Sequence, residues 1–155
     1  MGDLDATGTT TSVSELMPGL RVGIGDTSGT LSFRTDGALH LETRETDGPY
    51  EWAEISISLA DPAWHLCRRI HFQITVCATL PVEVMPALRL FSVGQFHDLF
   101  PAAPIPVYPE TIRCGCVFDL IPRQMVDIER MDLQLFLSNQ EHQLTVFDMS
   151  VVGTH

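Results

Sequence analysis

The segment from residue 69 to residue 79 constrains the fold more than any other part of the chain. Apolar residues occupy every second position from Ile70 onward, and mostly polar residues fill the positions between them. This period of two matches a β-strand, whereas a helix of the same sequence would scatter its apolar side chains around the whole axis. The pattern predicts a strand that buries Ile70, Phe72, Ile74 and Val76.

Similar extended segments recur along the chain and are separated by turn signals at short intervals. The strongest turn signal is Asp36-Gly37, because both residues can adopt positive φ in a tight hairpin. No segment has the pattern of a long amphipathic helix that would connect parallel strands. The sequence therefore predicts an all-β fold, an antiparallel β-sandwich of eight or nine strands with jelly-roll topology. The expected strands are 20–24, 31–35, 38–43, 53–59, 69–79, 87–96, 112–119, 131–137 and 142–152.

The composition predicts one domain, which we place at residues 20–155. A chain of 155 residues with 45% hydrophobic residues has room for a single core. Residues 1–19 are rich in Thr, Ser, Gly and Asp and are predicted to form a flexible N-terminal arm. Residues 97–111 are rich in proline, which lacks a backbone donor, and are predicted to form a long loop.

The last two strands carry two further predictions. Residues 138–141 are expected to join them as a hairpin. Asp148 has the same phase as Leu144 and Val146, so a regular strand would bury its carboxylate. We therefore predict a β-bulge near Phe147 that shifts the register.

Charge excludes two classes of partner. The formal net charge is -11, from 20 acidic and 9 basic residues, and such a chain repels a phosphate backbone or an anionic bilayer. We therefore expect neither nucleic-acid binding nor membrane insertion, since no apolar stretch has transmembrane length. The N-terminus lacks the pattern of a secretory signal, which predicts a cytoplasmic protein with reduced cysteines. All basic residues are Arg, which indicates a GC-rich, bacterial origin.

No motif in the sequence points to catalysis, a metal or a cofactor. The chain contains no Gly-x-Ser-x-Gly, no phosphate-binding glycine loop, no His-x-His and no CxxC pair. Cys114 and Cys116 are expected on the core face without a disulfide between them, because side chains two apart on a strand point in parallel. We predict a protein that is not an enzyme, with no catalytic residue, no metal ligand and no cofactor. A glycosidase-like pair of carboxylates stays open as an alternative, since acids such as Glu42, Glu54 and Asp132 could meet across the sheets, although alternation predicts that most of them face solvent.

The order of the segments resembles that of a known group of proteins. A long central strand and a proline-rich loop precede the closing pair Met131-Asp-Leu-Gln-Leu-Phe-Leu137 and Leu144-Thr-Val-Phe-Asp-Met-Ser-Val-Val152. In this order, residues 30–152 resemble the galactose-binding-like jelly rolls and related non-catalytic carbohydrate-binding modules. The resemblance implies a module that binds a carbohydrate or glycoconjugate through one sheet face or a rim. The alternative is a protein-interaction or assembly subunit that forms a homo-oligomer or hetero-complex through residues 97–111 and apolar strand edges.

The candidate ligand-binding residues follow from the polar side of the strands. Sugar hydroxyls pair well with amides, carboxylates and guanidinium groups, and residues of these types lie on the polar phase of three predicted strands. If those strands are neighbours, their side chains share one sheet face, on which we expect an exposed Arg89. A tryptophan between Asp61-Pro62 and the next strand is expected at a rim. The predicted ligand-binding residues are Arg89, His71, Gln73, Gln134, Asp132 and Trp64.

Overall fold

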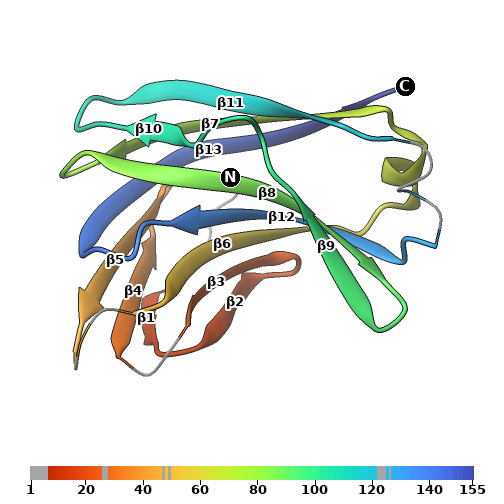
Figure 1. The fold of residues 1–155 in the computed structure, drawn as a ribbon. Coiled ribbons are helices and arrows are strands. Elements are labelled where there is room, and N and C mark those ends of the chain that lie inside the picture. Colours follow the sequence, from red (N-terminus) through yellow and green to blue (C-terminus); the bar gives the residue numbers. More distant parts are fainter. Residues whose placement is uncertain (1–6, 26–27, 47, 49, 122–124, 126) are drawn as a thin grey trace.

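Two antiparallel sheets packed face to face form the protein (Figure 1). The computed structural model describes residues 7–25, 28–46, 48, 50–121, 125 and 127–155. The six-stranded sheet contains, in spatial order, β1 (Thr7–Thr10), β4 (Gly29–Thr35), β5 (Leu39–Glu45), β13 (His142–Thr154), β7 (Arg69–Ala78) and β11 (Ile112–Asp119). The seven-stranded sheet contains β10 (Ile105–Val107), β8 (Val82–Ser92), β12 (Arg130–Leu137), β6 (Trp52–Leu59), β3 (Leu20–Gly25) and β2 (Val13–Met17), and β9 (Gln95–Leu99) also pairs with β8.

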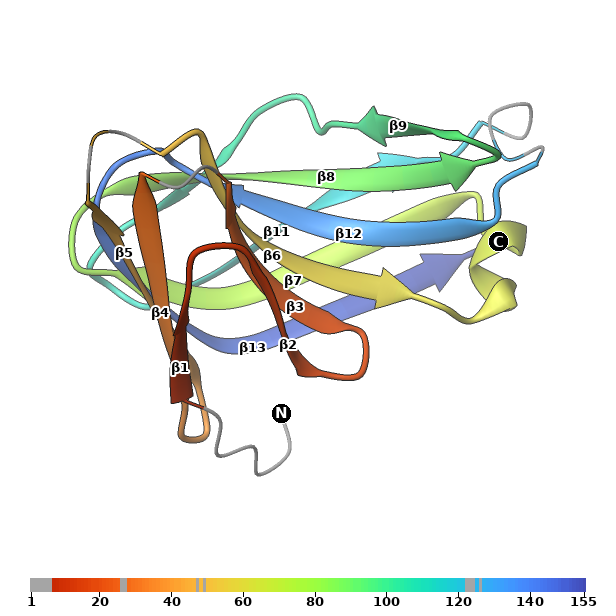
Figure 2. The ribbon, with the colours of Figure 1, turned by 90° about the horizontal axis from the view of Figure 1, so that it is seen from below.

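The predicted all-β antiparallel sandwich is confirmed, with more strands than expected. The described residues contain thirteen strands and one short 3-10 helix, η1 (Pro62–Leu66), between β6 and β7. No helix within the described ranges is long and apolar enough to cross a membrane. The additional strands β1, β2, β9 and β10 are short and lie along the margins of the two sheets (Figures 1 and 2).

The core lies between the two sheets and has the predicted register. Ile70, Phe72, Ile74 and Val76 of β7 are all buried, and Leu133 of β12 is buried in the same core cluster. Burying side chains of this size stabilises the fold by about 1.5–3 kcal/mol each. A slip of one residue in β7 would turn this whole set toward solvent, so the register is strongly determined.

Two predicted local features are confirmed. Asp36 and Gly37 lie in the turn of the β4–β5 hairpin, where Gly37 has φ +86°. In β13 the register with β7 shifts between Val146 and Asp148. This bulge leaves Asp148 exposed, so its carboxylate stays in water.

Three predictions about connections are wrong. Residues 138–141 do not close a hairpin, because both edges of β12 are already paired with β6 and β8, and the chain crosses to the other sheet. Residues 97–111 are not one loop, since β9 and β10 add to the edge of β8 and tolerate proline there. The N-terminal arm is shorter than predicted, because residues 7–10 and 13–17 form β1 and β2. Residues 1–6 lie outside the described part of the chain.

A buried polar cluster fixes the crossing between β12 and β13. The Tyr50 hydroxyl lies 3.0 Å from the Thr43 hydroxyl and 3.0 Å from the Ser138 carbonyl oxygen. His142 Nδ1 lies 2.7 Å from the Gln140 carbonyl oxygen, to which it donates, and the buried Nε2 atom has no hydrogen-bond partner among the described residues. Burial lowers the pKa of His142, although its bond to Gln140 opposes this shift. A proton on Nε2 would therefore be unpaired inside the protein.

We expect His142 to make folding weaker in acid. Because its pKa in the folded state lies below its ordinary value of 6.5, the unfolded chain takes up the proton first, and stability falls as the pH decreases below 6.5. One group contributes a slope of at most about 1.4 kcal/mol per pH unit. The His142→Asn variant keeps a donor near the Nδ1 position and removes the titrating ring. Urea unfolding measured between pH 7.5 and pH 5 should show a smaller loss of stability for this variant than for the wild type. If the free energy of unfolding falls equally with pH in both proteins, His142 is not the group responsible.

Candidate functional site

Charged and aromatic side chains gather on the outer face of the seven-stranded sheet. Along β12, Met131, Leu133 and Leu135 enter the core, so the residues between them lie on the opposite side of the strand. Strands β6 and β8 flank β12 and present their own alternate residues on that side. We call this surface the acid–arginine face. It consists of Arg21, Glu54, Ser56, Arg89, Asp98, Arg130, Asp132 and Gln134 with Phe91, Phe96 and Phe136.

The polar groups nearest the backbone of this face are buried. Asp132 is 0% exposed, Gln134 4% and Glu54 8%, although none of them points into the core. Outward polar residues of a sheet normally lie in water. Here Arg21 and Arg130 contact Asp132, Arg21 and Arg89 lie near Glu54, and the phenylalanine rings of the face lie against Arg89 and Arg130. The acid–arginine face therefore has a buried acidic layer beneath a cationic and aromatic layer.

Arg21 and Asp132 form the innermost ion pair. Arg21 Nη2 lies 2.7 Å from Asp132 Oδ2 and 3.3 Å from the Ser56 hydroxyl, which links β3, β6 and β12. The other carboxylate oxygen of Asp132 is 3.3 Å from Arg130 Nε, but it forms no hydrogen bond with a described residue. One carboxylate oxygen is therefore firmly bonded, and the second is only loosely paired.

Arg89 and Asp98 form a second, bidentate pair at the β8–β9 border. Arg89 Nε and Nη2 each lie 2.7 Å from an oxygen of Asp98. The hydrogen bonds to Asp98 raise the pKa of Arg89 further, so the guanidinium stays charged. Its Cζ lies 4.2 Å from the centre of the Phe96 ring and 5.8 Å from that of Phe136, within the range of cation–π contacts. The Arg89 guanidinium thus contacts two aromatic rings in addition to the Asp98 carboxylate.

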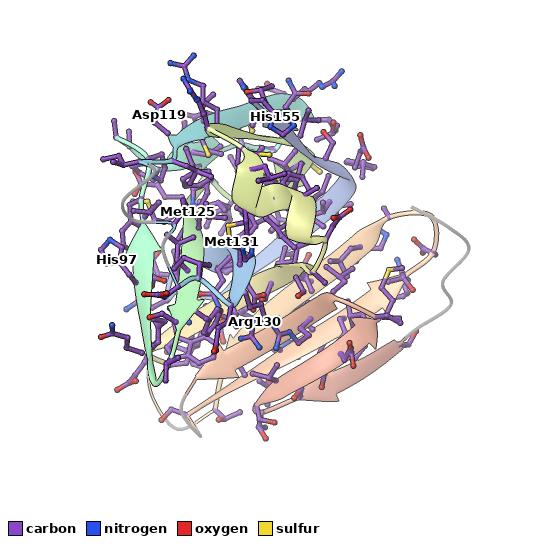
Figure 3. The ribbon with its side chains drawn as sticks, turned by 90° about the vertical axis from the view of Figure 1, so that its right-hand side faces the viewer. His97, Asp119, Met125, Arg130, Met131 and His155 are labelled. Carbon is purple, nitrogen blue, oxygen red and sulfur yellow. The ribbon has the colours of Figure 1, made fainter. Side chains whose placement is uncertain are left out.

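Arg130 is the loosest cation of the face. Its Cζ lies 3.8 Å from the centre of the Phe91 ring, and its side chain is 47% exposed. Its 3.3 Å contact with Asp132 is longer than the 2.7 Å contact that Arg21 makes with the same carboxylate. Figure 3 shows Arg130 and Met131 at the start of β12, where they extend to opposite sides of the strand, and His97 of β9 lies at the margin. Since an exposed guanidinium with one long ion pair moves at little cost, Arg130 can act as a movable cover.

Glu54 is the least compensated charge of the face. Burial raises its pKa, while the nearby Arg89 and Arg21 oppose the shift without forming a hydrogen bond to its carboxylate. The Gln134 Oε1 atom is also buried without a partner among the described residues. Together with Asp132 Oδ1, it makes two buried acceptor oxygens on β12 that have no hydrogen-bond partner among the described residues. Such groups are costly to bury unless something else binds them.

The structure brings three of the six predicted site residues together. Arg89, Asp132 and Gln134 share the acid–arginine face, but His71 and Gln73 belong to β7 in the other sheet. The prediction of one common face is therefore wrong, because β7 pairs with β13 and β11 and not with β8 or β12. The expectation of an exposed Arg89 is also wrong, since its side chain is 19% exposed.

Trp64 lies apart from these residues, on η1 at an end of the sandwich. Its side chain is partly buried, packs on the core cluster and lies against Gly153 of β13. Contact with a ligand remains a prediction for Trp64, His71 and Gln73, as it does for the other three residues.

Sequence reasoning missed Arg21, Asp98 and Arg130 and named Glu54 only as an open alternative. Arg21 and Glu54 have the outward phase of predicted strands, which alternation indicates, whereas Arg130 precedes the predicted strand 131–137 and Asp98 lies in the segment predicted as a loop. Their convergence depends on the order of strands in the sheet, which alternation alone leaves open. Arg21 and Asp132 are 111 positions apart in the sequence.

Cysteine and metal chemistry have little support in the described ranges. Cys67, Cys77, Cys114 and Cys116 are free thiols, which confirms that Cys114 and Cys116 form no disulfide with each other. Burial raises the pKa of the Cys116 thiol to about 11, so it stays protonated. No three His, Cys, Asp or Glu residues within these ranges are placed to hold a metal ion together.

Comparison with solved structures identifies the fold. The N-terminal cellulose-binding domain of β-1,4-glucanase C from Cellulomonas fimi is similar with a TM-score of 0.57 and 10% identity, over 88% of this chain and 90% of that one. The CBM22-1 xylan-binding domain of Xyn10C from Paenibacillus barcinonensis gives a TM-score of 0.55 and 10% identity, over 99% and 98%. The xyloglucanase domain of NopAA from Sinorhizobium fredii gives 0.51 and 10%, over 97% of each.

These similarities establish a jelly-roll sandwich like that of carbohydrate-binding modules. They confirm the fold that the resemblance in the sequence implied. No protein-family model matches the chain. No curated protein matches it by sequence.

We expect Glu54→Gln to stabilise the protein near neutral pH. A raised pKa means that ionisation of Glu54 opposes folding, so stability is lost as the pH rises above the ordinary value of 4.5. The neutral amide fills the same space without a buried charge, and a gain of about 1 kcal/mol raises the melting temperature by roughly 2–4 °C.

Thermal unfolding at pH 4 and pH 7.5 checks this expectation. The gain should appear at pH 7.5 and shrink at pH 4. Glu83→Gln, on the exposed part of β8, is the matched control and should change little at either pH. A lower melting temperature for Glu54→Gln at pH 7.5 would show that the carboxylate is a net stabilising partner of the arginines.

Proposed function

We propose that the protein is a non-catalytic carbohydrate-binding module and that the acid–arginine face is its ligand-binding surface. The observation that carries the proposal is the pair of buried, unpaired acceptor oxygens on Gln134 and Asp132, with the buried Glu54 carboxyl beside them, next to guanidinium groups and phenyl rings. A protein that bound nothing here would gain stability by replacing these groups with apolar ones. Their presence indicates a ligand that supplies hydrogen-bond donors.

The chemistry of a sugar suits this arrangement. Each sugar hydroxyl donates one hydrogen bond and accepts others, so it can bond a carboxylate and a guanidinium at once. The Phe96 ring, 58% exposed at the β8–β9 edge, offers an apolar surface to the face of a pyranose. Carboxylates, guanidinium groups and an aromatic ring thus supply both polar and stacking contacts.

A sugar could reach the buried acceptors if Arg130 moved. Movement of this half-exposed side chain would uncover Asp132 Oδ1, which the present contact holds only at 3.3 Å. Arg21 would keep its short bond to the other oxygen, so Asp132 would stay in position. The ligand would then replace one long ion pair with direct hydrogen bonds.

The comparisons and the charge support a neutral glycan as the ligand. Two similar structures are described as cellulose-binding and xylan-binding domains, and a third as in complex with cellobiose. With a net charge of -11, the protein repels acidic polysaccharides at long range. We therefore infer a neutral β-linked oligosaccharide as the ligand class of this face.

Glycoside hydrolysis is the second candidate, since one similar structure is a xyloglucanase domain and the raised pKa of Glu54 suits a general acid. Hydrolysis needs a second available carboxylate. Asp132 is bonded to Arg21 and lies near Arg130, and Asp98 is held by Arg89. We therefore infer binding without catalysis. Release of reducing ends from xyloglucan, abolished by Glu54→Gln, would reverse this inference.

The assembly interpretation has less support from the structure. Residues 97–111 were expected to supply its contact surface, but β9 and β10 are used within the seven-stranded sheet. Phe100 and Tyr108 stay exposed as single aromatic residues. The cytoplasmic location and the bacterial origin remain predictions from the sequence.

We expect Phe96→Ala and Glu54→Gln to weaken sugar binding at least about tenfold each, through lost stacking and a lost charge-assisted acceptor. Titration calorimetry with cellohexaose and xylohexaose measures the affinity. Glu54→Gln should combine weaker binding with higher stability, a combination that a purely structural role does not produce.

The matched control is the double variant His71→Ala, Gln73→Ala, which alters polar residues on the outer face of the other sheet. It should bind as the wild type does. If this control loses affinity while Phe96→Ala and Glu54→Gln keep it, the ligand lies on the six-stranded sheet. If none of a panel of neutral glycans binds, the proposed function is wrong.

A further inference from the structure

A hollow outside the acid–arginine face has a volume of about 720 Å³. It lies on the outer face of the six-stranded sheet, across β1, β4, β5, β13 and the end of β7. Figures 1 and 2 show β1, β4 and β5 running steeply across the direction of β7 and β11, so the sheet turns sharply between them. We call this hollow the β4–β5 groove, defined by Thr9, Ser32, Arg34, His40, Glu42 and Thr145.

Hydroxyl groups are the most common polar groups in the groove. Thr9 Oγ1 and Ser32 Oγ lie 3.1 Å apart on neighbouring strands. Thr145 Oγ1 of β13 lies 3.1 Å from His40 Nδ1 of the neighbouring strand β5. Hydroxyl groups both donate and accept, which allows them to match another hydroxyl in either direction.

The charged groups of the groove are fixed in place and balance each other. His40 Nε2 lies 2.7 Å from Asp36 Oδ1, and Arg34 Nε lies 3.1 Å from the other Asp36 oxygen. Glu42 accepts hydrogen bonds from Arg44 at 2.8 Å and from Gln143 at 3.0 Å, and these bonds lower its pKa, so it stays ionised. The guanidinium groups of Arg34 and Arg44 are matched by the carboxylates of Asp36 and Glu42, so these ion pairs leave no excess of arginine charge for a phosphate or sulfate.

Size and lining together define the class of ligand. A volume of about 720 Å³ lies within the range of small-molecule sites, roughly 300–1,000 Å³. Cys77, which is partly exposed, and Pro109, which is exposed, add apolar atoms at one end of the groove, whereas the neighbouring Leu41 and Leu144 are buried in the core. A ligand that is uncharged, rich in hydroxyls and apolar on one face satisfies all three conditions, and a short segment of neutral oligosaccharide has these properties.

We propose that the β4–β5 groove is a second carbohydrate-binding site, specific for a neutral oligosaccharide, and that the protein is bivalent. The inference extends the proposed function, since it adds a site to the acid–arginine face. The two surfaces are the outer faces of opposite sheets, so one sugar chain does not block the other. A module with two such sites links separate glycan chains and gains avidity on a polysaccharide.

Chemical-shift mapping with ¹⁵N-labelled protein tests the two sites separately, with cellohexaose and xylohexaose as probes. The variants are Phe96→Ala for the acid–arginine face and the double variant His40→Ala, Glu42→Gln for the groove. Arg69→Ala, on the same outer face as the groove but outside it, is the matched control. If the double variant loses its amide dispersion, Thr145→Val replaces it.

We expect saturable shifts at β4 and β5 that persist in Phe96→Ala. The double variant should raise the dissociation constant measured at β4 and β5 at least about tenfold and leave that measured at β6 and β12 unchanged. Only the wild type and Arg69→Ala should make soluble xylan turbid, because cross-linking needs both sites.

Three results would overturn the second site. Shifts confined to β6, β8, β9 and β12 would leave the proposed function intact and remove the groove as a site. Shifts at β4 and β5 that vanish in Phe96→Ala would show that they are transmitted from the other face. Concentration-dependent shifts at β4 and β5 without sugar, with a doubled mass, would assign the groove to a second copy of the chain. Absence of binding at both faces would refute the proposed function as well.

Discussion

The buried ion pair between Arg21 and Asp132 is the interaction on which the acid–arginine face depends. Strand β12 lies between β8 and β6 inside its sheet, and Asp132, on the outer side of that strand, is 0% exposed. A buried carboxylate without its partner would destabilise the fold by about 3–5 kcal/mol. The 2.7 Å bond to Arg21 satisfies one oxygen and ties β12 to β3 across β6. The remaining polar groups of the face are arranged around this fixed point.

Only some of the polar groups on the acid–arginine face have hydrogen-bond partners, and the unpaired ones are the basis of its proposed function. Fully paired networks such as Arg89 with Asp98 make a surface rigid, whereas unpaired acceptors such as Gln134 Oε1 reduce stability. Natural proteins keep such costs at sites where a ligand removes them. The six-stranded sheet differs, because the charges in the β4–β5 groove are already paired and its ligand would meet mainly hydroxyl groups.

The sequence predicted the local structure of this protein well and the pairing of its strands into two sheets less well. Alternation identified β7 and the residues it buries, and phase alone predicted the bulge before Asp148. These features depend on neighbouring residues. The site depends on which strands pair, and β7 and β8, adjacent in the chain, belong to different sheets. For this reason His71 was grouped with Arg89, although the sandwich separates them, and Arg21 was missed, although it contacts Asp132. The marginal strands β1, β2, β9 and β10 have too few apolar residues to show a clear period.

The side-chain Nε–H signals of the arginines test the central claim most directly. The chain has 9 Lys and Arg residues, all of them Arg, so a ¹⁵N spectrum of the guanidinium region is simple enough to assign. Titration with cellohexaose and xylohexaose should shift the Arg130 and Arg89 signals saturably, with Arg130 moving most because its contact with Asp132 is replaced. Arg69 and Arg113, on the opposite sheet and outside the β4–β5 groove, should stay unchanged. If the Arg69 or Arg113 signals shift saturably while those of Arg130 and Arg89 stay unchanged, the acid–arginine face is not the sugar-binding surface.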